Sequence, residues 1–82
     1  MSYYVYMLKI VGKKTTTYVG YTKNLKNRIS LHNTGKGAKF TRGRKWKVIY
    51  KEKHSSKNKA ISREYYIKKN RKLRNQIKNK FI

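Results

Sequence analysis

The sequence contains neither cysteine nor proline. Without cysteine, the chain can form no disulfide, no thiolate metal site and no thiol nucleophile. It also lacks any apolar run near the roughly 20 residues that a membrane-spanning helix requires. Met1-Ser2-Tyr3 leads at once into a strand pattern, which predicts that no signal peptide precedes the domain. We therefore expect a cytoplasmic protein with no membrane partner.

Carboxylates are the scarcest charged groups. The chain has 24 lysines and arginines but only two acids, Glu52 and Glu64, which gives a formal net charge of +22. Self-repulsion at this density destabilises a compact fold unless a polyanion screens it. An AT-rich coding bias is an alternative source of the lysines, but glutamate codons are also AT-rich, so bias does not explain the missing acids. We predict a nucleic-acid partner, whose neutralised phosphates release counterions, and no small-molecule substrate.

The 82 residues allow one domain, covering 1–82. Residues 3–10 alternate aromatic and aliphatic side chains, which predicts a strand covered on both faces. A turn at 12–14 and a second β-rich run at 15–21 predict an antiparallel hairpin. Asn24 is suited to cap a helix that ends near 33–35, since its side chain can accept from the free N–H groups of the first turn.

The second half of the chain predicts one further strand and two further helices. Residues 35–44 form a basic, glycine-punctuated loop, and 46–53 predict a strand in which Trp46, Val48 and Tyr50 share one face. Trp46 is expected to pack in the core rather than stack on a base. Ser55-Ser56 precede a second helix, and 71–80 predict a third. The expected fold is therefore α+β, with a three-stranded, mainly antiparallel sheet, flanking helices and the order β-β-α-β-α-α.

Glu64 is the strongest candidate for chemistry in the second helix. It lies at helical spacing with Ala60, Ile61 and Ile67, a stripe expected to face the sheet. One reason for an inward carboxylate is a metal such as Mg²⁺, which is often held by one or two carboxylates, waters and phosphate oxygens. The alternative, an ion pair with Lys68, has equal weight on composition alone. Glu52, among the lysines of its strand, is expected to be a solvated pair partner.

Arg28 and His32 are four residues apart and share one face of the first helix. Arginine can hold a phosphate through two parallel bonds, and histidine can donate to it or move a proton. The alternative is a solvated basic face with a histidine near the helix end. Tyr6 and Tyr18 could activate a water, but spacing alone favours a cross-strand core pair. His54, beside a cap, is expected to be structural.

These residues together resemble the GIY-YIG nuclease superfamily. The paired signature is Tyr4-Val5-Tyr6 followed by Tyr18-Val19-Gly20, and the resemblance then runs in order through most of the chain. The further matching positions are Tyr21 to Arg28, His32-Asn33, Gly35 to Ala38, Thr41-Arg42, Ala60, Arg63-Glu64 and Ile67-Lys68. The chain looks most like small single-domain relatives of the nuclease domain in bacterial excision-repair endonucleases and junction nucleases.

The resemblance implies a site made of Tyr6, Tyr18, Arg28, His32 and Glu64, with Glu64 holding one Mg²⁺ or Mn²⁺ ion. A tyrosine would activate water and Arg28 would stabilise the phosphate. The implied function is a DNA endonuclease of low sequence specificity, related to repair or to particular DNA structures. The alternatives are a non-catalytic nucleic-acid-binding module and an RNA-directed nuclease. Basic residues expected to grip the nucleic-acid backbone are Lys23, Lys36, Lys39, Arg42 and Arg44.

Two positions depart from the family pattern. Tyr4 replaces the glycine of the first signature, as is common in the small relatives. Tyr21 stands where excision-repair members carry lysine, directly after the second signature. The group that shares proton transfer with the tyrosines is therefore open at this stage.

Overall fold

The computed structural model describes residues 2–37 and 39–80. Met1, and Ala38 in the predicted loop, lie outside the described residues. The elements are β1 (Tyr3–Ile10), β2 (Thr17–Thr22), α1 (Leu25–Asn33), a 3₁₀ turn η1 (Lys39–Thr41), β3 (Trp46–His54), α2 (Lys57–Lys69) and α3 (Arg71–Asn79). The predicted order is confirmed, and so is the α+β fold class. None of the helices traced over these residues is long and apolar enough to cross a membrane.

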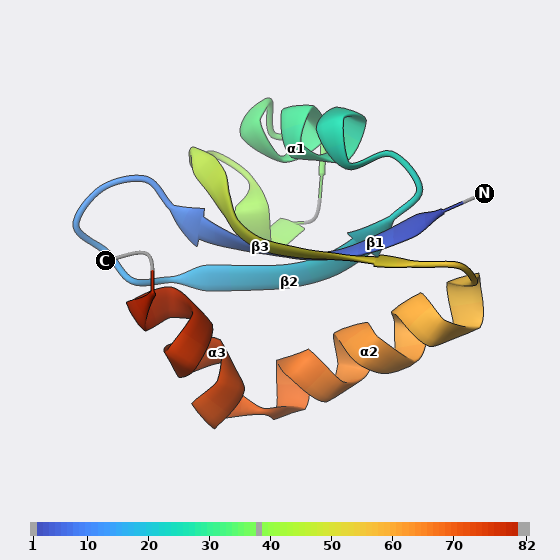
Figure 1. Ribbon diagram of the computed structural model, residues 1–82. Coiled ribbons are helices and arrows are strands. Elements are labelled where there is room, and N and C mark those ends of the chain that lie inside the picture. The colour runs from blue at the N-terminus through green and yellow to red at the C-terminus, as the bar shows by residue number, and fades with distance from the viewer. Residues whose placement is uncertain (1, 38, 81–82) are drawn as a thin grey trace.

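The three strands form one antiparallel sheet in the order β2-β1-β3, with β1 in the centre. Figure 1 shows α1 on one face of the sheet and α2 with α3 on the other. Alternate residues of β1 supply both cores: Val5 and Met7 pack toward α2 and α3, whereas Leu8 and Ile10 pack on the α1 side. This is why β1 reads as continuously apolar.

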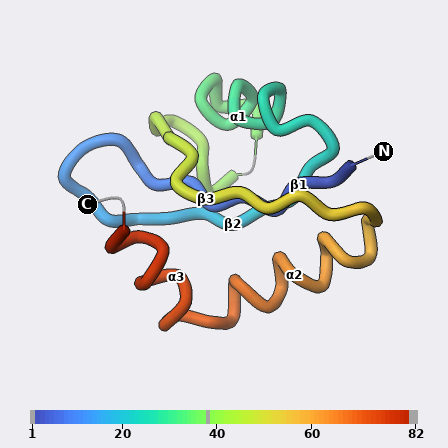
Figure 2. The backbone as a smooth tube through the Cα atoms, in the orientation of Figure 1, coloured from blue at the N-terminus to red at the C-terminus, as the bar shows by residue number. Residues whose placement is uncertain are grey.

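The helix caps follow the sequence. Asn24 accepts a hydrogen bond from the Asn27 backbone N–H at 3.1 Å, and Ser56 accepts from the Lys59 N–H at 3.2 Å. Asn70 ends α2 and also caps α3, where its side chain accepts from the Leu73 N–H. The tube in Figure 2 shows the resulting sharp bend between the two helices. Both predicted cap positions, Asn24 and the serine pair, are confirmed.

The prediction that Trp46, Val48 and Tyr50 share a face of β3 is wrong. The register changes between Met7 and Leu8: Met7 pairs with Tyr50, but Leu8 pairs with Val48. The extra β3 residue is a β-bulge, which reverses the alternation of side chains. Trp46 and Val48 therefore pack on the α1 side, whereas Tyr50 packs against the core beneath α2. Trp46 is 3% exposed, as expected for a core residue.

The predicted inward stripe of α2 is correct in part. Ala60 and Ile67 are fully buried, and they are seven residues apart, close to two helical turns. Ile61 is 40% exposed, so its expected place in the stripe is wrong. The buried line through Ala60 and Ile67 leaves Ile61 on one flank of the helix. Glu64 is intermediate in burial, not at the centre of the packed face.

Glu52 is a pair partner but not a solvated one. Its side chain is only 15% exposed and receives the Arg63 Nε–H at 2.9 and 3.0 Å. The Tyr50 hydroxyl also donates to it, and His54 Nε2 lies 2.8 Å away. Burial alone would raise the pKa of Glu52, but the hydrogen bonds from Arg63, Tyr50 and His54 together lower it. Because of the bulge, these β3 side chains face α2, and Glu52 fastens the helix to the sheet.

Candidate active site

The absence of a side chain at Gly20 sets the position of the Tyr6 ring. Gly20 lies directly opposite Tyr6 in the β1–β2 register. A Cβ atom at Gly20 would lie 2.6 Å from the Tyr6 hydroxyl oxygen and 2.8 Å from Cζ. Tyr6 therefore lies across β2, on the α1 side of the sheet, only because residue 20 is glycine. Gly37 does the same for His32, since a Cβ there would be 2.5 Å from Nδ1.

A buried chain of polar groups starts at Tyr6. Its hydroxyl lies 2.8 Å from His32 Nε2, and His32 Nδ1 lies 2.7 Å from the Thr41 hydroxyl. All three residues are essentially inaccessible to water. Thr41 is held in turn because the Trp46 indole N–H donates to its carbonyl at 3.0 Å. These hydrogen bonds join β1 to α1 and η1, and the Tyr6–His32 bond spans 26 residues of sequence.

Burial determines the charge states of Tyr6 and His32 in this series of hydrogen bonds. Burial raises the pKa of the Tyr6 phenol to about 12, the charges of Tyr18 and Glu64 act in the same direction, and the Arg28 guanidinium opposes them. Burial also lowers the pKa of His32, and Arg28 lowers it further. At neutral pH the imidazole is therefore neutral, with one donor and one acceptor nitrogen. Tyr6 keeps its proton and can donate it to Nε2, with Nδ1–H then donating to Thr41.

Tyr18 lies where the contributing elements meet. Its ring centroid is 5.0 Å from that of His32 and 6.4 Å from that of Tyr6. Phe40 of η1 stacks on Tyr18 with centroids 6.1 Å apart. From the other direction, the Lys68 ammonium of α2 lies 5.9 Å from the Tyr18 ring centroid. Tyr18 therefore packs in the core and also lies between His32 on the α1 side and Lys68 of α2.

Glu64 reaches this region from the opposite face of the sheet. β2 is an edge strand, so side chains of α2 can pass its outer border. Glu64 is 18% exposed and its Oε1 lies 3.3 Å from the Lys68 ammonium, which itself contacts Tyr18. The charge of Glu64 also raises the pKa of Tyr6, which places the carboxylate within electrostatic reach of the phenol. The ion pair with Lys68, one of the two interpretations of Glu64, is therefore present, and the metal-ligand interpretation stays a prediction.

The residues around Glu64 fit a hard divalent cation that takes only one or two of its ligands from the protein. Among residues 2–37 and 39–80 there is no group of three histidine, cysteine or acidic side chains that could form a closed metal cage. A single partly exposed carboxylate is instead the kind of anchor that Mg²⁺ uses when waters and phosphate oxygens complete its shell. The Lys68 ammonium beside Oε1 shows that this spot accepts a positive charge.

The structure brings Tyr6, Tyr18, Arg28 and His32 together on the α1 side, with Glu64 at the border. The five predicted backbone-gripping residues are spread more widely and are all exposed: Lys23, Lys36, Lys39, Arg42 and Arg44. The last four belong to the 35–44 loop, which η1 anchors through buried Thr41 and through Phe40. Arg44 lies over the Phe40 ring at 5.6 Å, so part of this basic loop adjoins the site.

Sequence reasoning assigned no role in the site to two of its neighbours, Thr41 and Phe40. Thr41 and Phe40 contact His32 and Tyr18, and Lys68 contacts Glu64 and Tyr18. The ion pair of Lys68 with Glu64 was predicted, because a lysine four residues after a glutamate lies above it on a helix, and the structure contains it. Thr41 and Phe40 depend on how the loop folds back. Tyr21 packs against the core on the α2 side, so it does not join Tyr18 on the site face.

The fold is a three-stranded antiparallel sheet with α1 packed over Tyr6 and Tyr18. Comparison with known proteins shows that this is the fold of a family of catalytic domains. Residues 2–78 match the model of the GIY-YIG catalytic domain, and the chain belongs to this family. Among similar proteins are UPF0213 proteins of Clostridium perfringens and Oceanobacillus iheyensis. The first is 54% identical over 80% of this chain and 70% of its own length; the second is 46% identical over 80% and 76%.

A solved relative has the same fold. The solution NMR structure of a UPF0213 protein from Bacillus halodurans is 38% identical and superposes with a TM-score of 0.56. The match covers 94% of this chain and 82% of that one. The resemblance expected from the two tripeptide signatures is therefore confirmed at the level of family and fold.

Proposed function

We propose that this protein is a divalent-metal-dependent endonuclease that hydrolyses DNA phosphodiester bonds with low sequence specificity. The observation that carries the proposal is the convergence of a buried Tyr6–His32 hydrogen bond, the Arg28 guanidinium and the Glu64 carboxylate around Tyr18. A net charge of +22 supplies affinity for a polyanion. Most exposed basic groups would contact phosphates, which carry no sequence information.

Each side chain has a definite task in this proposal. Arg28 binds the phosphate and stabilises the negative charge that grows as water attacks phosphorus and the P–O bond breaks. Tyr6 is almost fully buried, so this role requires the attacking water to reach its hydroxyl when the phosphate binds. The hydroxyl then accepts a proton from the water while it passes its own proton to His32 Nε2, 2.8 Å away. The raised pKa of Tyr6 makes this transfer necessary, because the phenol does not ionise unaided near neutral pH. Tyr18 orients His32 and borders the phosphate.

Glu64 would hold the metal ion, Mg²⁺ or Mn²⁺. When bound, the ion would supply positive charge to the phosphate and stabilise the developing charge in hydrolysis. Lys68 must release Glu64 for this to occur. An exposed i, i+4 ion pair contributes only about 0.3–0.5 kcal/mol, so a divalent ion with a phosphate beside it can displace the ammonium.

Plasmid nicking tests the proposal directly. Wild-type protein should convert supercoiled plasmid to the open circle with Mg²⁺ or Mn²⁺ and not with a chelator. Glu64→Gln should abolish nicking but keep DNA binding, since it removes a charge and almost no volume. The matched control is Lys72→Gln, an exposed change on α3, which should nick at close to the wild-type rate. Tight DNA binding by the wild type with no nicking in either metal would contradict the proposal.

A non-catalytic nucleic-acid-binding module is the second candidate. It is favoured by the Lys68–Glu64 contact, because an ammonium at 3.3 Å competes with a metal for the carboxylate. Binding that is independent of metal and unaccompanied by cleavage would support it. An RNA-directed nuclease is distinguished by matched DNA and RNA hairpins: preferential cleavage of the RNA hairpin would replace DNA by RNA in the proposal. Cleavage confined to branched DNA would indicate a role in repair.

A further inference from the structure

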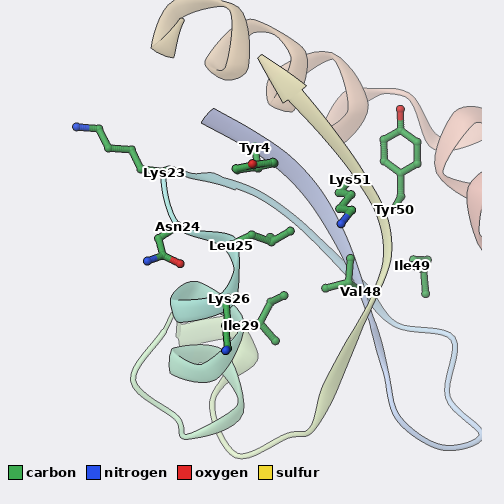
Figure 3. Close-up of a pocket in the computed structure, with 10 residues that line it drawn as sticks. All are labelled: Tyr4, Lys23, Asn24, Leu25, Lys26, Ile29, Val48, Ile49, Tyr50 and Lys51. Carbon is green, nitrogen blue, oxygen red and sulfur yellow. The ribbon is translucent and has the colours of Figure 1, made fainter. Parts of the chain in front are cut away.

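A concave surface lies on the α1 side of the sheet, beside the candidate active site. It is an open groove of about 960 Å³ between the N-terminal half of α1 and strands β1 and β3. Figure 3 shows Tyr4, Leu25, Ile29 and Val48 along the groove, with Lys51 beside them and Lys26 on the helix. The centre of the groove is therefore aromatic and aliphatic, and ammonium groups lie around it.

The groove adjoins the candidate active site through shared elements. Tyr4 and Tyr6 are alternate residues of β1, so they face the same side of the sheet about 7 Å apart along the strand. On α1, Ile29 directly follows Arg28, and Leu25 and Ile29 pack against the cluster that contains Tyr6 and Tyr18. A nucleic-acid strand with one phosphate bound at Arg28 would therefore have its neighbouring nucleotide near Tyr4.

The chemistry of the lining selects the occupant. An apolar groove with a tyrosine ring and lysines at its border complements a flat apolar ring system attached to negative charge. A nucleotide has this composition, and bases stack on aromatic side chains independently of sequence. A second copy of the chain does not, because each copy carries a net charge of +22. A base inside an intact duplex cannot enter, since both of its faces are covered by stacking.

We infer that the groove receives one unpaired nucleotide of the nucleic-acid strand bound at the active site. Its base would stack on Tyr4 and pack on Ile29 and Val48, and its phosphate would lie near Lys26 or Lys51. This inference deepens the proposed function by naming the substrate class, DNA with an unpaired nucleotide next to the bound phosphate. The groove can be occupied whether or not the strand is then cut.

Binding in a chelator tests the groove separately from cleavage. The probes are two otherwise identical DNA duplexes, each containing one 2-aminopurine, either unpaired in a single-nucleotide bulge or paired with thymine. Wild-type protein should bind the bulged probe about 5- to 150-fold more tightly, the range for stacking one base, and should quench its fluorescence. Tyr4→Ser and Lys51→Ser should remove most of this preference.

Matched controls separate the groove from general effects. Tyr65→Ser replaces a tyrosine that is 59% exposed on α2, and Lys72→Ser removes a positive charge from α3, both on the other face of the sheet. These controls should lower affinity for both probes alike and keep the preference. If Tyr4→Ser does not fold, Lys51→Ser still tests the groove, because Lys51 is exposed and its replacement should leave the fold intact. Equal wild-type affinity for the two probes, or a preference that survives both groove variants, would overturn the inference.

The two proposals fail in different ways. Loss of metal-dependent nicking with an intact preference for the bulge would remove the nuclease and keep the groove. Nicking of plain duplex with no preference for unpaired nucleotides would remove the groove and keep the nuclease. A dimer in sedimentation analysis that Tyr4→Ser dissociates would assign the groove to a second copy and overturn the inference.

Discussion

A single added methyl group at Gly20 should disturb both the fold and the site. Gly20→Ala would place a Cβ atom 2.6 Å from the Tyr6 hydroxyl oxygen and 2.8 Å from Cζ. Both distances are well inside van der Waals contact. Tyr6 is 1% exposed, so its ring cannot move into solvent to relieve the contact. The ring must shift within a packed core, or β2 must move away from β1.

The magnitude follows from two effects. Overpacking a well-packed core costs about 1–3 kcal/mol. Moving the Tyr6 hydroxyl away from His32 Nε2 also loses a buried hydrogen bond, for about 1 kcal/mol. The sum is about 2–4 kcal/mol, which in a domain of this size lowers Tm by roughly 8–30 °C. Cleavage should fall with it, because the relay from Tyr6 to His32 is displaced.

A double-mutant cycle isolates the contact. In a Tyr6→Leu background the two shortest contacts of the added Cβ atom are gone and Tyr18 Cε2 at 3.1 Å remains, so adding Gly20→Ala should cost less than about 1 kcal/mol more. The coupling energy should then be about 1–3 kcal/mol, measured by thermal or urea unfolding of the four proteins. If Gly20→Ala melts within about 2 °C of wild type, or costs the same in both backgrounds, the steric explanation for this glycine is wrong.

Three further predictions concern His32, Lys68 and Glu52. Because the folded pKa of His32 lies below its ordinary value of 6.5, the unfolded chain binds more protons below that pH. The stabilisation is complete above pH 6.5 and is lost as the pH falls; Tm measured from pH about 7.5 to 5 should decline less steeply in His32→Gln. Lys68→Met frees Glu64 from a partly exposed pair and should tighten Mn²⁺ binding about twofold by calorimetric titration; unchanged affinity would mean that the pair does not compete with metal. Glu52→Gln removes the charge that Arg63, Tyr50 and His54 bind and should cost about 1–2 kcal/mol in urea unfolding, discounted for the exposure of Arg63. No loss of stability there would refute its role in fastening α2 to the sheet.

The elements of this fold are predictable because local signals agree with the tertiary structure. Residues 3–10 have high β-propensity with apolar side chains on both faces and form β1 over the predicted bounds, and Asn24 caps α1 with its side chain as its residue type predicts. The bulge in β3 is different. It depends on how β3 fits against Met7 and Leu8 of β1, and residues 46–53 themselves contain no glycine to mark it. That one extra residue turned Tyr50 and Glu52 toward α2.

Sequence analysis singled out the side chains that the structure brings together on the α1 side, but not the contacts between them. Spacing alone favoured Tyr6 as a core residue, and it is buried, yet its hydroxyl also bonds His32 26 residues away. No local pattern carries that contact, because it depends on α1 docking over β1. The exposure of Glu64 was likewise set by its place on the flank of α2. Helical spacing predicts the face of α2 on which Glu64 lies. The position of β2 at the edge of the sheet brings that face next to Tyr18.

We propose that Tyr6 and Glu64 act in one phosphodiester-hydrolysing site. Single-turnover cleavage of a bulged DNA duplex with Mg²⁺ tests this most directly, comparing wild type, Tyr6→Phe, Glu64→Gln and the double variant. If the two residues act as a unit, each single change should slow cleavage by about 100-fold or more, and the double change should add little. Cleavage by Glu64→Gln at the wild-type rate would contradict the claim.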